Sequence, residues 1–213
     1  SVLDVRIKSA DNILAGKRSF IDHHWNLVPP KDSVRTKLLL GHRFLNESRY
    51  YNYNDSGGSD HFGDLVIGRS TISDRAKLKR IKNQIYTEFN TPFTGKLRAG
   101  IAAVQSNYFF GLEEGEEVSD TVPSQIKTTQ YLLSGDWNFR WKGFSMRATL
   151  QKSTGGSLLS DEIGVKARYE FPNKAAFTAR TSFRNQSPDF NFQLYKSDYQ
   201  SYNWYNPNLE NQK

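Results

Sequence analysis

Hydrophobic side chains recur at every second position over most of this chain. In the stretch 163–171, the odd positions are Ile, Val, Ala, Tyr and Phe, and the even positions are Gly, Lys, Arg and Glu. A β-strand places successive side chains on opposite faces, whereas a helix repeats its apolar positions about every 3.6 residues. The pattern therefore predicts strands that have one apolar face and one charged face.

Short turn signals separate consecutive alternating runs. Residues 172–174 read Pro-Asn-Lys, where proline presets its own φ, and alternation resumes over 175–184. Two alternating runs joined by about three residues indicate a β-hairpin. The other predicted strands lie near 19–27, 34–51, 81–89, 97–103, 131–141 and 144–151.

The connections between these runs alternate in length. Short turns are expected near 29–33, 91–95, 141–143 and 172–174, and long polar loops near 52–78, 111–124, 153–160 and 185–200. Short turns on one rim, long loops on the other and strands of about ten residues are typical of a transmembrane β-barrel. We predict an all-β, antiparallel transmembrane β-barrel with about ten strands in this chain, residues 1–213 being part of one barrel domain. A soluble antiparallel sandwich shares the alternation and stays the alternative.

Aromatic residues form two groups along the predicted strands. One group lies beside the short turns and the other lies where strands enter the long loops, as expected for the two interface girdles of a barrel. The first group is Phe89, Phe93, Trp137, Phe139, Trp141, Phe144, Phe171 and Phe177, and the second is Tyr50, Tyr51, Tyr53, Tyr108, Phe109 and Phe110.

The composition fits a barrel better than a large soluble core. Hydrophobic residues make up 37% of the chain and aromatic residues 14%, and the mean hydropathy is −0.69. A barrel in lipid needs apolar residues only at alternate strand positions, because its lumen and loops are polar. The chain has no cysteine. This excludes disulfide frameworks, thiolate metal sites and cysteine nucleophiles.

Several stretches resemble the putative porin family of Bacteroidetes outer membranes. They are RIKSADN at 6–12, FIDHH at 20–24, LGHRF at 40–44, YYNY at 50–53, DHFGD at 60–64, FNFQLYKSDY at 190–199 and YNWYN at 202–206. The resemblance spans nearly the whole chain and implies a barrel located in the bacterial outer membrane. Members of that family are considerably longer, so the resemblance also implies that this chain is an internal piece of a larger barrel.

Catalytic, cofactor and metal sites are not expected. The phosphate-binding, dinucleotide-binding, zinc-protease and serine-hydrolase motifs are missing from the sequence, so we expect neither an enzyme nor a cofactor. His23 and His24 are adjacent on a predicted strand and therefore point to opposite faces. Acidic loops around Asp55, Asp60 and Asp64 and at 113–117 could bind Ca²⁺, but neither follows the EF-hand spacing, and solvated loops are the favoured interpretation.

Basic residues follow the strand face opposite the apolar one, which in a barrel is the lumen. Arginine or lysine on the lipid face at mid-depth would cost about 2–4 kcal/mol each. The candidate pore-lining residues are Arg98, Arg140, Arg147, Lys166, Arg168, Arg180 and Arg184. They are either solvated or paired, with Asp136 and Glu170 as nearby partners, or they form a positive interior that favours anions.

Passive diffusion of small polar solutes or ions across the outer membrane is the function that these features favour. The first alternative is an accessory barrel subunit of a secretion or uptake complex, with Tyr199, Tyr202, Trp204 and Tyr205 as a contact surface. The second is a secreted, soluble all-β binding module. The expected partners are outer-membrane lipid and, in addition, other outer-membrane proteins or copies of this chain. Nucleic acid is not expected, because the net charge of +7 is spread along strands.

Overall fold

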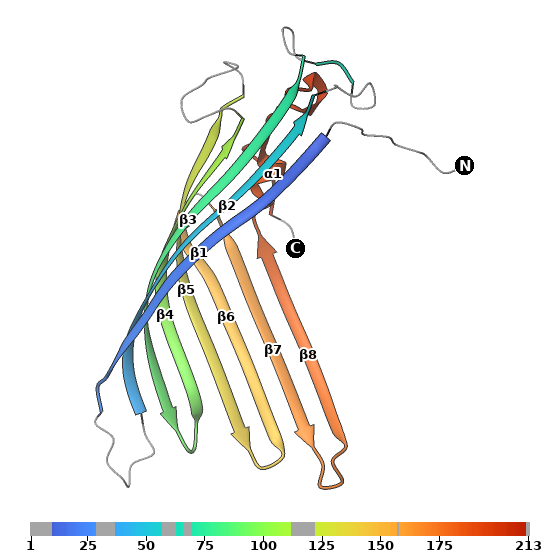
Figure 1. Ribbon diagram of the computed structural model, residues 1–213. Helices are drawn as coiled ribbons and strands as arrows, with labels where there is room; N and C mark the ends of the chain where they lie inside the picture. Colours follow the sequence, from blue (N-terminus) through green and yellow to red (C-terminus); the bar gives the residue numbers. More distant parts are fainter. Residues whose placement is uncertain are drawn as a thin grey trace.

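Eight long strands form one antiparallel sheet in which each strand pairs with the next one along the chain. The computed structural model describes residues 10–28, 37–56, 63–65, 70–111, 122–156 and 158–211. The strands are β1 (Ala10–Asn26), β2 (Lys37–Asp55), β3 (Ile72–Thr91), β4 (Gly95–Phe110), β5 (Gln125–Trp141), β6 (Phe144–Gly156), β7 (Ser160–Glu170) and β8 (Ala176–Gln186). Figure 1 shows them as a tall, twisted sheet with tight turns at one end.

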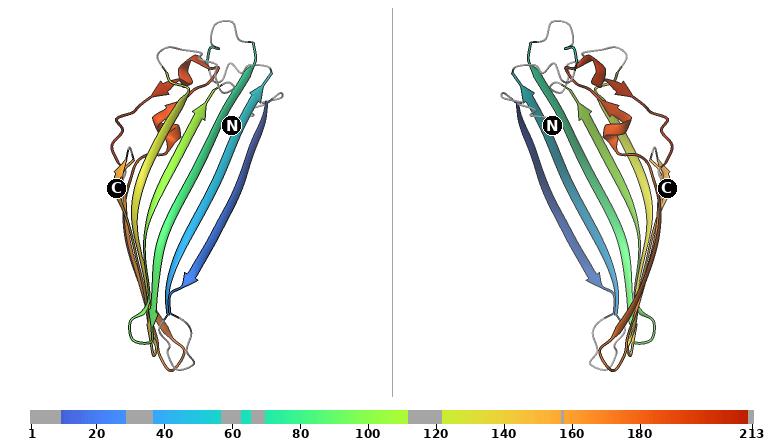
Figure 2. Two further views of the ribbon diagram at one scale, coloured as in Figure 1. Left: turned by 90° about the vertical axis from the view of Figure 1, so that its left-hand side faces the viewer. Right: turned by 90° about the vertical axis from the view of Figure 1, so that its right-hand side faces the viewer.

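A C-terminal segment, residues 187–211, follows β8. It contains the short helix α1 (Phe190–Gln193), the two-residue strands β9 (Leu194–Tyr195) and β10 (Trp204–Tyr205), and a 3-10 turn, η2 (Gln200–Tyr202). β9 and β10 pair with each other and not with the large sheet. In both side views this segment lies at the end of the sheet away from the tight turns (Figure 2).

The prediction of an all-β antiparallel fold is confirmed, but the expected strand number is wrong. Among the described residues the large sheet has eight strands, not about ten. Each of the eight predicted segments corresponds to one of them, and the two further strands, β9 and β10, belong to the C-terminal segment. β1 and β8 form the two edges and do not pair with each other within the described residues, so the sheet is open there.

Three of the four predicted short turns lie where the sequence places them. β3 and β4, β5 and β6, and β7 and β8 are joined at 92–94, 142–143 and 171–175. Gly95, Lys142 and Lys174 have positive φ values of 72°, 47° and 67°, which tight reversals between strands require. The fourth predicted turn, at 29–33, lies outside the described residues.

The predicted long loops are shorter than expected in two places. The prediction of a long loop at 153–160 is wrong, because β6 continues to Gly156 and β7 begins at Ser160. The loop at 52–78 also loses both ends to β2 and β3, whereas the bounds predicted at 111–124 agree with the ends of β4 and β5. Strand ends that are polar on both faces show no alternation, so the pattern underestimates strand length.

The register separates the sheet into two faces, since residues paired directly across strands share a face. Leu97, Trp137, Ala148 and Val165 form one cross-strand row, and we name this side the apolar face. The adjacent row, one residue further along each strand, contains Lys96, Asn138, Arg147 and Lys166 and belongs to the charged face.

Large apolar side chains are exposed on the apolar face. Ile85, Ile101 and Trp141 keep 52%, 61% and 62% of their surface exposed. The buried cluster of Ala102, Val104 and Leu132 lies instead on the charged face. No described element covers the apolar face, so the sheet has the opposite arrangement from a water-soluble sandwich, which buries its apolar side.

The two expected aromatic girdles have different outcomes. Register places Phe89, Trp137, Phe139, Trp141, Phe144 and Phe177 on the apolar face near the short turns, in agreement with the first girdle. The second girdle is wrong in part. Tyr108 and Phe110 are 7% and 2% exposed on the charged face, where they pack against Leu194 of the C-terminal segment. Only Tyr50 and Phe109 of that group lie on the apolar face.

Candidate functional site: the charged face

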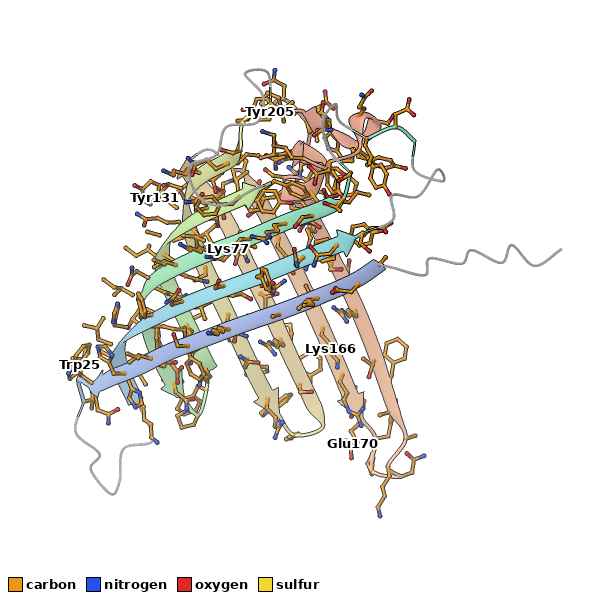
Figure 3. All side chains as sticks on the ribbon, turned by 45° about the horizontal axis from the view of Figure 1, so that its top comes forward. Trp25, Lys77, Tyr131, Lys166, Glu170 and Tyr205 are labelled. Atoms are coloured by element: carbon orange, nitrogen blue, oxygen red, sulfur yellow. The ribbon has the colours of Figure 1, made fainter. Side chains whose placement is uncertain are left out.

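All seven basic residues selected from the sequence lie on the charged face. Arg147, Lys166 and Arg180 are direct cross-strand partners on β6, β7 and β8. Arg140 and Arg168 belong to the next row towards the turns, where both face Ser145. Arg98 lies opposite Asp136, and Arg184 lies opposite Glu162. Figure 3 labels Lys166 and Glu170 on β7.

Four of the seven cations have a carboxylate partner. Arg147 pairs with Asp136 at 3.0 Å and Arg168 with Glu170 at 3.3 Å, so both predicted acidic partners are confirmed. Two further partners were not predicted from the sequence. Glu88 accepts contacts of 2.7 Å from both Arg98 and Lys96, and Glu162 accepts one of 2.9 Å from Arg184. These pairs join different strands, so only the register reveals them.

The other three cations have no acidic partner among the described residues. They are Arg140, Lys166 and Arg180. Adjacent strands are about 4.8 Å apart, so Lys166 and Arg180 are two cations on neighbouring strands, beside Arg147, whose charge is paired with Asp136. Like charges directly opposite each other destabilise a sheet, and a bound anion would relieve this repulsion. An open cavity of about 530 Å³ borders the row and is lined by Arg140, Arg147, Lys166 and Arg168.

A second polar group surrounds Tyr86 on β3. The Tyr86 hydroxyl donates to Asp22 at 2.8 Å, and Asp22 also accepts from Nε of Arg43 at 3.0 Å. The guanidinium of Arg98 lies 4.7 Å from the centre of the Tyr86 ring, a cation–π contact. Gly41 and Gly100 are the direct cross-strand partners of Tyr86, and a Cβ on Gly41 would overlap the ring.

A further cavity of about 490 Å³ lies on the charged face beside the C-terminal segment. Its lining includes four cations, Arg18, Arg49, Arg80 and Lys82, together with Glu47 and Asp189. Glu47 pairs with Arg49 at 2.7 Å and lies 3.9 Å from Arg80. The charged face is therefore basic at each of these two cavities.

The C-terminal segment packs against the end of the charged face away from the short turns. Leu194 is fully buried against Tyr108 and Phe110, and Phe190 stacks on Tyr108 with ring centres 5.4 Å apart. Tyr195 packs on Phe110 at 4.4 Å. Burial here raises the pKa of Tyr195 to about 12.

Backbone and carboxylate groups reinforce this docking. The amide of Ser73 donates to the Asp198 carboxylate at 2.9 Å, and the amide of Asp198 donates to Asp74 at 2.9 Å. Asp74 is 5% exposed, and burial together with the nearby Asp198 raises its pKa. The segment narrows the space above the charged face at this end.

The described residues hold no group of three or more His, Cys, Asp or Glu side chains that could bind a metal ion. Register places His23 opposite His42 on the apolar face, with ring centres 5.0 Å apart, and the adjacent His24 on the charged face as expected. Of the acidic loops, Asp60 and residues 113–117 lie outside the described residues. In the described part of the chain, no helix is long and apolar enough to cross a membrane.

Comparison with known families agrees with this geometry. The model of the family described as Putative porin matches residues 1–213, the whole chain. The chain belongs to this family. A search of curated proteins found no match. Family membership suggests a non-enzymatic, porin-like role in the outer membrane and agrees with the resemblance found in the sequence.

Proposed function

We propose that this porin-family chain forms part of an outer-membrane β-barrel through which small polar solutes and ions diffuse passively, with no catalytic step. One observation carries the proposal: the apolar face is exposed and the charged face is the more buried one. Such a sheet is unfavourable in water and favourable in a bilayer, where the exposed band contacts lipid and the charged face lines a lumen.

The exposed apolar residues form a band near the short turns. On β3 the band runs from Ile81 to Phe89, and the apolar-face residue on the far side of Ile81 is Lys79. About nine strand residues tilted by about 40° rise about 23 Å, close to the ≈25 Å apolar band of transmembrane barrels. The first or second polar position beyond the apolar band on each strand is occupied by Lys79, Asn107, Lys127 or Asp161. In outer-membrane barrels the short turns face the periplasm, so the longer connections would face outwards.

The unpaired cations on the charged face favour anions among the transported solutes. Arg140, Lys166 and Arg180 have no carboxylate partner among the described residues. Arg140 and Lys166 line an open cavity, and Arg180 is the cross-strand partner of Lys166. A cationic lumen raises the local concentration of anions and excludes cations. The C-terminal segment, on the same side of the sheet, would form the narrow part of the pore at the outer end.

The two alternatives have less support. A soluble binding module would leave the apolar face, including Ile101 at 61% exposure, in contact with water. An accessory subunit would use the aromatic residues at 199–205 for contacts. Tyr202 and Tyr205 are exposed, but Tyr199 is only 4% exposed and Trp204 stacks on Tyr195 within the segment.

Planar-bilayer recording of the full-length protein tests the proposal. We expect stepwise conductance and a reversal potential, under a salt gradient, that indicates anion preference. Lys166→Gln should reduce this preference, whereas Lys152→Gln on the adjacent strand removes the same charge from the apolar face and should not. A full-length protein that inserts and never conducts would contradict the pore, and equal effects of both variants would contradict a charged-face lumen.

A further inference from the structure

The apolar face carries a cluster of lysines just beyond the end of the lipid-facing band. Lys17, Lys79 and Lys127 belong to one cross-strand row, on alternate strands β1, β3 and β5, with Ser48 and Asn107 between them. Lys77 lies two residues beyond Lys79 on the same face, opposite Tyr50 and Phe109. The ammonium of Lys79 packs over the Phe109 ring at 5.6 Å.

In the described part of the chain, no acidic residue occupies the apolar face of β2–β5. The other apolar-face positions there are occupied by asparagine, serine, threonine, glutamine and aromatic residues and by Arg75. The first acidic one is Asp11 near the start of β1. Lys17, Lys77 and Lys127 have no ion pair with any described residue. Among the described residues of β2–β5, this face therefore carries only positive charge where a bilayer would change from hydrocarbon to headgroups.

An apolar furrow lies directly below the cluster on the same face. It has a volume of about 560 Å³ and is lined by Ile85, Ile101, Ala103, Tyr131 and Leu133. Ala103 lies between Asn83 and Tyr131 in one cross-strand row, and because its side chain is small the furrow stays open there. Lys79 and Lys127 are four residues from Asn83 and Tyr131 along their strands, or about 13 Å in an extended chain. Figure 3 labels Lys77 on β3 and Tyr131 on β5.

We propose that this surface is a binding site for a phosphorylated glycolipid of the outer leaflet, with its phosphate on the lysine cluster and an acyl chain in the furrow. The proposal rests on the proposed outer-membrane location. Its charge complementarity is specific, because a basic group above an apolar furrow matches an anionic headgroup above a hydrocarbon chain. Neither feature is needed for solute passage, because both lie on the face opposite the charged one.

The test compares lipids that differ only in phosphate. The full-length protein is reconstituted into phosphatidylcholine nanodiscs, and retention of diphosphorylated lipid A or its dephosphorylated form is counted by native mass spectrometry after detergent extraction. We expect the wild type to retain diphosphorylated lipid A selectively. Lys77→Gln combined with Lys127→Gln should weaken retention about 30-fold, since each lysine near an anionic surface contributes about a fivefold factor.

A matched control removes the same charge at the opposite end of the sheet. Lys142→Gln with Lys174→Gln changes two lysines at the short turns and should leave lipid retention unchanged. Ala103→Phe fills the furrow without changing charge and should also weaken retention. Equal losses in the control and test variants, or equal retention of the dephosphorylated lipid, would overturn the site.

Conductance separates the failure of this site from the failure of the proposed function. A protein that conducts in phosphatidylcholine and shows no preference for diphosphorylated lipid A overturns the lipid site alone. A full-length protein that does not insert into bilayers overturns both the lipid site and the pore. If the protein retains no lipid A and instead associates with copies of itself through this face, the lipid site would also be overturned. The face would then be a contact between copies of the chain.

Discussion

At the scale of single residues, the packing of Tyr86 shows how side chains of the charged face are held in a fixed arrangement. Its ring lies over Gly41, its hydroxyl reaches Asp22 on β1, and Arg98 packs against the ring from β4. A tyrosine lying flat over glycine covers a backbone that has no side chain of its own. One residue of β3 therefore connects four strands, and it orients the guanidinium of a candidate pore-lining arginine.

Gly41→Ala is expected to disturb this arrangement. The added methyl group would overlap the Tyr86 ring, and steric overpacking of this kind costs about 1–3 kcal/mol. Urea unfolding in lipid vesicles, followed by tryptophan fluorescence, measures the loss. Gly16→Ala on β1 is the control, since its nearest new contact would be 3.8 Å from the Ser48 carbonyl and should change stability by less than about 0.5 kcal/mol. Equal stability of both variants would mean that Tyr86 moves aside freely.

At the scale of elements, the strands and the C-terminal segment divide the molecule into two zones. The lower part of each long strand carries the apolar band, whereas the upper parts of β2–β5 extend beyond it and are polar on the apolar face. The C-terminal segment packs on the charged face of these upper parts through Leu194, Phe190 and Tyr195. The buried cluster around Leu194, one of the two apolar clusters of the described residues, thus lies outside the bilayer zone, where water is present to drive apolar burial.

Docking of the C-terminal segment should depend on pH through Asp74, which lies beyond the membrane band. Its pKa is raised by burial and by Asp198, so the folded arrangement favours the protonated form. The stability that the protonated Asp74 carboxyl gives to the docked segment is fully present below the ordinary pKa of aspartate. It is lost as the pH rises through the raised pKa of Asp74. Asp74→Asn keeps an oxygen that accepts from the Asp198 amide and removes the charge. At neutral pH it should slow hydrogen exchange at the Asp198 amide by about fivefold.

The pH series provides the check on this expectation. The hydrogen-exchange rate of the Asp198 amide should differ between the wild type and Asp74→Asn at neutral pH. The two rates should become equal as the pH falls. Faster exchange in Asp74→Asn at neutral pH would instead show that the ionised carboxylate stabilises the docked segment.

At the scale of the whole molecule, the polarity of the two faces decides which solvent each one contacts. Trp137 and Trp141 lie on the apolar face and are 37% and 62% exposed, whereas Trp204 stacks on Tyr195 in the C-terminal segment. Exposed aromatic residues at the edge of an apolar band are typical of a membrane interface. The proposed orientation therefore places Trp25, Trp137 and Trp141 in contact with lipid and Trp204 in contact with water or protein.

Quenching by brominated lipid distinguishes these environments. In variants that keep a single tryptophan, fluorescence of Trp137 or Trp141 should be quenched at least about twofold more than that of Trp204 in brominated phosphatidylcholine vesicles. Aqueous iodide should show the reverse order. Equal lipid quenching at all three positions would contradict the assignment of the apolar face to the bilayer.

Much of this architecture follows from local pattern. Alternation places Arg98, Arg147 and Lys166 on one face and Ile101, Val165 and Phe177 on the other, because the two-residue period of a strand needs no knowledge of its neighbours. The pattern fails where strands leave the apolar band. There, Tyr108 and Phe110 were expected to face lipid, and the C-terminal segment covers them instead.

The amino-acid sequence alone determined the fold class, the two faces and the family, since each depends on residue order within a strand. Only the tertiary structure decided which charges are paired. The pairs of Glu88 with Arg98 and of Glu162 with Arg184 depend on the register between strands. So does the row of Lys166 and Arg180, which have no acidic partner in the described part of the chain. The docking of Leu194 onto β4 joins segments more than eighty residues apart, and no local pattern encodes a contact that depends on the path of the whole chain.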